Sequence, residues 1–186
     1  EIKIENKTEF LETTLQALEK KDDATLGDLF CALLLACGRR PSTLHLSCDR
    51  WALVPGKEDK NCILFLETLK KRGHLAEPAQ IPLLCSGSVF LKALKRFQKK
   101  CKCLPNSDGK ECTEATAQAL YGKMHREWCK DCHAGKLRPK DFRAVYSAFL
   151  AKRGGGLSAP ATISQALVHT VPQTAIHYLH VNLSDK

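Results

Sequence analysis

The sequence lacks any apolar run long enough to cross a membrane. Its longest uncharged apolar run, Leu29–Gly38, falls well short of the roughly 20 residues that a membrane-spanning helix needs. The first residues do not show the basic, apolar and small-residue order of a signal peptide. Internal repeats and low-complexity tracts are also missing. With 44% hydrophobic and 26% charged residues, the composition is that of an ordinary globular protein, which argues against membrane-spanning and disordered classes.

The sequence also lacks the short motifs that mark common catalytic sites. It contains no P-loop, no G-x-G-x-x-G, no H-E-x-x-H and no G-x-S-x-G pattern. Nucleophilic catalysis by cysteine needs a nearby base, and the histidines show no motif spacing with a cysteine and an aspartate or asparagine. We therefore expect a protein that is not an enzyme, with a cysteine-dependent enzyme as the third alternative.

Positive charge is concentrated in one part of the chain. Residues 1–85 carry a net charge of −1, whereas residues 86–186 carry +10. Such asymmetry indicates that the basic part meets an anionic partner. We expect residues 86–153 to bind an acidic protein or nucleic acid, with a lysine-rich solvated surface as the alternative interpretation.

The most basic segment has the pattern of an amphipathic helix. Ser88 can begin this helix, and Phe90, Leu94 and Phe97 form its apolar face. The cations between the apolar positions predict an anion-binding face, with point charges for phosphates but no aromatic side chain for base stacking. Its residues are Lys92, Lys95, Arg96, Lys99, Lys100 and Lys102.

Ten cysteines are present, and part of them cluster in the basic segment. Zinc prefers four thiolate or imidazole ligands, commonly supplied in closely spaced pairs. The cluster predicts a zinc site whose candidate ligands are Cys101, Cys103, Cys112, Cys129, Cys132 and His133. Two alternatives stay open. Cys101 could form a disulfide with Cys112, and Cys103 with Cys129 or Cys132; or all of them could be simple buried thiols.

The state of the cysteines bears on the compartment of the protein. Cys31 and Cys37 lie inside an apolar run, which suits reduced core residues. The sequons at Asn6 and Asn182 fit a secreted protein instead, although such sites often arise by chance. We expect an intracellular protein with reduced cysteines, and a secreted, disulfide-bonded protein is the alternative.

Helical patterns dominate the chain. Thr25 with Asp28 predicts the beginning of a helix that Gly38 ends. Other helices are expected after Asn6, over Asp59–Arg72, from Ser88, after Thr113 and from Pro139. The alternation over Thr174–Leu183 predicts a strand.

These elements predict a mainly α protein, a compact multi-helix bundle with a cysteine-rich basic second half and a partly extended C-terminal tail. The expected parts are a near-neutral helical bundle over 1–80, a basic cysteine-rich helical part over 86–153 and a tail over 154–186.

Two segments resemble known families. The run Leu64–Glu77, with its Leu69-x-x-Arg72-Gly73-x-Leu75 pattern, resembles the middle of a death effector domain. This resemblance implies a six-helix death-fold bundle over residues 8–100 that assembles through like domains. Residues 89–120, with Leu94-x-x-Phe97-Gln98, Asp108-Gly109 and Thr116-x-x-Ala119-Leu120, are similar to peptidoglycan-binding-like helical modules.

The sequence therefore favours a non-enzymatic intracellular adaptor or binding protein, whose basic, cysteine-clamped half engages an acidic protein or nucleic acid. The alternative is a secreted, disulfide-bonded helical protein that binds a receptor or a glycan.

Overall fold

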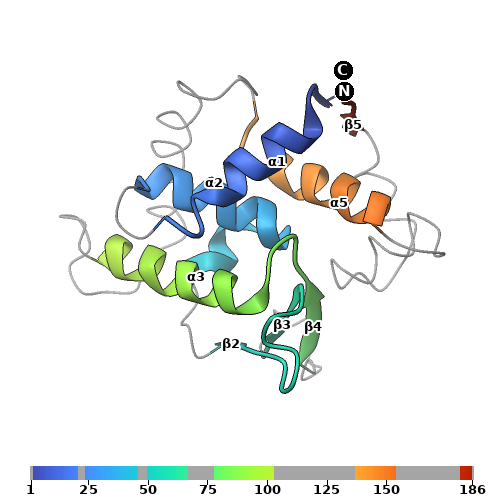
Figure 1. Ribbon diagram of the computed structural model, residues 1–186. Helices are drawn as coiled ribbons and strands as arrows, with labels where there is room; N and C mark the ends of the chain where they lie inside the picture. Colours follow the sequence, from blue (N-terminus) through green and yellow to red (C-terminus); the bar gives the residue numbers. More distant parts are fainter. Residues whose placement is uncertain are drawn as a thin grey trace, which may run out of the picture.

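A computed structural model describes residues 2–20, 24–45, 50–66, 78–102, 137–153 and 181–185. Four α-helices, one short 3-10 helix and five strands lie within these residues (Figure 1). The helices are α1 (Lys7–Gln16), α2 (Leu26–Cys37), η1 (Pro41–His45), α3 (Gly87–Lys102) and α5 (Asp141–Arg153). The strands are β1 (Ile2–Ile4), β2 (Trp51–Ala52), β3 (Cys62–Phe65), β4 (Ala79–Pro82) and β5 (Val181–Leu183). No helix within these ranges is long and apolar enough to cross a membrane.

Helix α2 lies at the centre of the core. It packs against α1, α3 and α5, and ten of its 12 residues are buried. The predicted capping box is confirmed: Asp28 N donates to Thr25 Oγ1 at 3.1 Å, and Thr25 N donates to the Asp28 carboxylate at 3.0 Å. Gly38 ends the helix with φ +60°. Because α2 is apolar on nearly all sides, it is buried inside this shell of other helices.

The other described helices also match the sequence pattern. Phe90, Leu94 and Phe97 of α3 are fully buried, as are Phe142 and Val145 of α5. Helix α1 begins after Asn6 as predicted, but the Asn6 side chain bonds Glu9 and does not cap the backbone. The helix predicted after Thr113 lies outside the described residues.

A three-stranded antiparallel sheet replaces one predicted helix. Strand β3 lies between β2 and β4, with Trp51 opposite Phe65 and Ile63 opposite Ile81. The prediction of a helix over Asp59–Arg72 is therefore wrong for Cys62–Phe65. Four consecutive apolar residues do not distinguish a buried strand from a helix turn by periodicity, and here cross-strand pairing satisfies the backbone.

The C-terminal strand pairs with the N-terminal one. β5 runs parallel to β1, with Ile2 opposite Val181 and Ile4 opposite Leu183. Lys152 Nζ of α5 donates to Leu183 O at 2.7 Å, and Lys7 N donates to Ser184 O at 2.9 Å. The strand predicted over Thr174–Leu183 is thus confirmed at Val181–Leu183. Both ends of the chain lie together (Figure 1).

The mainly α bundle of the sequence prediction is wrong, because two sheets contribute to the fold. Core residues come from every described segment, from Ile4 to Leu183, and form one hydrophobic cluster. The predicted parts 1–80, 86–153 and 154–186 remain a prediction.

Candidate functional site

Two arginines from separate elements come together beside the C-terminal end of α2. Arg39 follows Gly38, the residue that ends α2, and Arg143 is the third residue of α5. Both side chains are partly buried. The two guanidinium groups are close enough for Arg143 to lower the pKa of Arg39, although burial has the larger effect in the same direction. Two like charges therefore share a site with limited access to water.

The thiol of Cys37 lies next to this arginine pair. Burial raises the pKa of Cys37 to about 11, and the charges of Arg39 and Arg143 oppose that shift. The thiol is therefore protonated at neutral pH, so it does not neutralise the two cations.

Aromatic rings support Arg39 from the sheet. Its Cζ atom lies 5.6 Å from the centroid of the Phe65 ring in β3. The rings of Trp51 and Phe65 are 4.6 Å apart, and Trp51 is 5.3 Å from Phe90 of α3. A cation over an aromatic face is attracted by the ring and held in orientation. The sheet therefore positions the guanidinium.

Tyr146 closes the inner side of the site. Its hydroxyl donates to Pro82 O at 2.7 Å, and its side chain is fully buried. Burial raises the pKa of the Tyr146 phenol, and the neighbouring Cys37 adds to the effect. The hydrogen bond of this phenol holds α5 against β4, and its burial keeps the hydroxyl away from solvent.

Two more cations adjoin the pair in sequence. Arg40 follows Arg39, and Lys140 precedes α5; both side chains are exposed. Partly buried arginines with exposed cations beside them suit an anion that inserts an oxygen or two while the rest of it stays in solvent.

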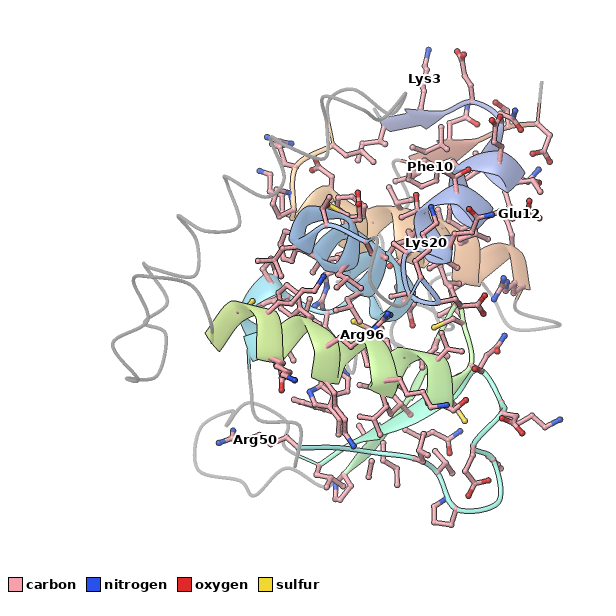
Figure 2. All side chains as sticks on the ribbon, turned by 60° about the vertical axis from the view of Figure 1, so that its left-hand side comes forward. Lys3, Phe10, Glu12, Lys20, Arg50 and Arg96 are labelled. Atoms are coloured by element: carbon pink, nitrogen blue, oxygen red, sulfur yellow. The ribbon has the colours of Figure 1, made fainter. Side chains whose placement is uncertain are left out.

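The predicted anion-binding residues of α3 divide into two groups. Lys92, Lys95 and Lys99 are exposed. Arg96 instead donates to Leu18 O at 2.5 Å and to Lys20 O, and Lys100 donates to Ala24 O at 3.0 Å. Figure 2 shows Arg96 beside Lys20. The side chain of Lys102 lies outside the described part, and anion binding by this helix stays a prediction.

The zinc prediction is not tested. Cys101 is buried near the end of α3, while Cys103, Cys112, Cys129, Cys132 and His133 lie outside the described residues. Within the described ranges no metal-binding group of three ligands is found, and no disulfide joins two of the described cysteines.

No family model and no curated protein matches the chain, but solved structures do. The chain resembles protelomerase TelK complexed with substrate DNA, with a TM-score of 0.73, 17% identity, and coverage of 100% of this chain and 38% of the other. It also resembles TelA protelomerase covalently complexed with substrate DNA, with a TM-score of 0.69, 19% identity, and coverage of 98% of this chain and 60% of the other. A third similar structure is the site-specific recombinase XerH bound to its difH substrate, with a TM-score of 0.60, 18% identity, and coverage of 97% of this chain and 50% of the other.

The fold is therefore that of protelomerase and site-specific recombinase structures. The chain spans 60% of the TelA protelomerase chain and less of the TelK and XerH chains. This finding corrects both family resemblances, because neither the death effector domain nor the peptidoglycan-binding module has this architecture. It also contradicts the non-enzymatic adaptor and its secreted alternative, since the structural neighbours are DNA-processing enzymes.

The sequence prediction missed the arginine pair. Arg143 was counted only among the charges of the basic half, and Arg39 was not singled out. One signal was present: Arg39 follows directly on a fully apolar helix that ends at Gly38. A cation at such a place is held near the core. The contribution of Arg143 could not be found, since about 100 residues separate it from Arg39 along the chain.

Proposed function

We propose that this chain is the DNA-binding and catalytic part of an enzyme that cuts DNA and rejoins it through a covalent protein–DNA link. The observation that carries the proposal is the pair of partly buried arginines, Arg39 and Arg143, in a fold shared with protelomerase and recombinase structures. Such an enzyme works inside the cell, and the described cysteines, none of which is joined to another by a disulfide, fit that compartment.

A phosphodiester fits the charge of the pair. Arginine forks bind phosphate oxygens through two parallel hydrogen bonds. Because Arg39 and Arg143 repel one another, an anion between them lowers the electrostatic energy of the site. As phosphorus is attacked, negative charge grows on its oxygens, and fixed guanidinium groups stabilise that charge.

The proposed step needs a nucleophile from the protein. One neighbour, an integrase bound to transposon DNA, carries a tyrosine-to-phenylalanine change, and tyrosine can attack a phosphodiester. A tyrosine oxygen then bonds to phosphorus, one deoxyribose oxygen leaves and takes a proton, and attack by a strand hydroxyl reverses the step. Tyr146 is excluded by its burial, which leaves Tyr121 and Tyr178, both outside the described residues.

The first prediction concerns the covalent adduct. The protein is incubated with labelled duplex DNA of random sequence, intact or nicked, and label that stays on the protein in denaturing gels is measured. Arg39→Ala and Arg143→Ala are expected to lower the adduct by about 100-fold or more, because each removes a donor to the developing charge. Lys3→Ala, which removes an exposed charge on β1, serves as control and retains the adduct.

The nucleophile is identified in the same assay. Either Tyr121→Phe or Tyr178→Phe is expected to abolish the adduct while circular dichroism stays unchanged. Adduct formation by both variants, or equal yields from wild type and Arg39→Ala, would contradict the proposed chemistry.

A further inference from the structure

Three exposed lysines on α3 form one row on the solvent side of the helix. Lys92, Lys95 and Lys99 lie three and four positions apart, so they share a face. This face is opposite to Phe90, Leu94 and Phe97, which are fully buried. We call Lys92, Lys95 and Lys99 the lysine row.

The neighbouring cations do not belong to this row. Arg96 and Lys100 lie on one flank of α3, where they donate to carbonyls of the segment between α1 and α2. These contacts fix the orientation of α3. Because these contacts hold α3 in one orientation, the fold keeps the side chains of the lysine row facing solvent.

Among the residues that the structure describes, no ion pair involves the lysine row. Helix α3 contains no aspartate or glutamate. The ion pairs found among the described residues join Lys7 to Asp185 and Arg138 to Asp141, away from α3. The positive potential of the row is thus left for an external partner.

The spacing of the row fits a nucleic-acid backbone. Lys99 lies seven positions after Lys92, a rise of about 10.5 Å at 1.5 Å per residue. One DNA strand carries a phosphate about every 3.4 Å along the duplex axis, so the length of the row covers about three steps from one phosphate to the next.

The row is also joined to the arginine site. Gln98, next to Lys99, donates to Leu44 O of η1 at 3.0 Å. Helix η1 follows Arg39 and Arg40 directly. The same short stretch of chain therefore links the arginine pair and α3.

We propose that the lysine row is a second DNA contact, which holds the backbone through non-specific charge while the arginine pair engages the reactive phosphate. This inference rests on the proposed function, since it takes duplex DNA as the substrate. On this proposal α3 contributes to the affinity for DNA, whereas Arg39 and Arg143 stabilise the charge that develops on the reacting phosphate.

The second prediction compares two triple variants of the whole chain. One replaces Lys92, Lys95 and Lys99 by glutamine; the control replaces the exposed Lys3, Lys57 and Lys60 in the same way. Both lose three charges, so a general effect of net charge is matched. Binding of a fluorescent random-sequence duplex is measured over a range of salt concentrations.

Each phosphate contact contributes about 0.9 to the slope of log affinity against log salt. The α3 variant is expected to lose about 2.7 from this slope, whereas the control loses less than about 1. A triple Lys→Arg variant of the row keeps its charge and is expected to restore the slope. Circular dichroism confirms that all variants fold.

The adduct assay separates the two proposals. At limiting DNA the α3 variant is expected to form less adduct than wild type, and raising the DNA concentration is expected to restore the yield. An unchanged salt slope in the α3 variant overturns the lysine-row proposal. That result is also expected if the row binds an acidic protein instead of DNA. The covalent adduct can still form in this case, so the proposed function would stand. Loss of the slope without any adduct in wild type supports the row as a DNA contact and overturns the proposed covalent chemistry.

Discussion

Gly38 determines how the chain leaves α2, and its lack of a side chain leaves room for the ring of Tyr146. Its φ of +60° is in the left-handed region that other residues rarely adopt. A Cβ atom built at this position would lie 2.1 Å from Cδ1 of Tyr146. The backbone turn and the tyrosine together place Arg39, the next residue, beside the site.

The third prediction is that Gly38→Ala destabilises the protein by at least about 2 kcal/mol, because left-handed strain adds to overpacking against Tyr146. Gly56 offers a matched control: its φ is +71°, and a Cβ atom at that position would meet nothing within 4 Å. Gly56→Ala is expected to cost about 1 kcal/mol, from strain alone. Denaturant unfolding measures both, and equal losses would contradict a role for the tyrosine contact.

At the residue scale, the sequence carried part of this arrangement. The stop signal at Gly38 was predicted from its position after an apolar run, and the structure confirms it. The partner ring was not predictable, because Tyr146 comes from an element more than 100 residues away. Local chemistry marks where a helix ends, whereas the side chain that packs there depends on the tertiary fold.

At the scale of elements, α2 depends on its cap as well as on burial. Four N–H groups at a helix N-terminus have no partner within the helix. The reciprocal bonds between Thr25 and Asp28 satisfy one N–H of α2 and the backbone N–H of its cap. Because the rest of α2 is apolar, these polar contacts fix the residue at which the helix begins.

The fourth prediction is that Thr25→Ala lowers the free energy of unfolding by about 1 kcal/mol through loss of the cap. Thr13→Ala is the control, since Thr13 is an exposed residue within α1. Alanine is the better helix former, so this change is expected to be neutral or to stabilise by a few tenths of a kcal/mol. If thermal unfolding shifted alike for both variants, the cap would have no special role.

Helices could be predicted where the spacing of the apolar residues agreed with the signals for a helix start or end. Helices α2, α3 and α5 each combine an apolar stripe with a start signal, and all three are found. Strand β3 was assigned to a helix because a run of four apolar residues fits either state. The pairing of β3 with β2 and β4 makes this segment a strand. Such pairing depends on residues far apart in the chain, so the local sequence does not reveal it.

At the scale of the whole molecule, the two ends of the chain hold each other. Lys7 pairs with Asp185, and Thr8 Oγ1 donates to the same carboxylate at 3.1 Å. These bonds lower the pKa of Asp185, chiefly through the hydrogen bond from Lys7. The contacts extend the β1–β5 pairing by one turn of α1.

The fifth prediction follows from the sign of that shift. A carboxyl whose folded pKa lies below its unfolded value stabilises the fold above the unfolded pKa, and this contribution disappears as the pH falls through the folded pKa. Wild type is therefore expected to melt at a slightly higher temperature than Asp185→Asn at neutral pH, and at the same temperature in strong acid. Thermal scans at both pH values check this; a difference that persists in acid would contradict it.

The β1–β5 pairing also has a consequence for how the protein is made. The ribosome synthesises Ile2–Ile4 nearly 180 residues before the strand that pairs with them. The helices around α2 can pack before that time, whereas β1 must wait without its partner until synthesis reaches Val181. The pairing of β1 with β5 is therefore a late step of folding during translation. A chain truncated before Val181 would leave the edge of β1 unpaired.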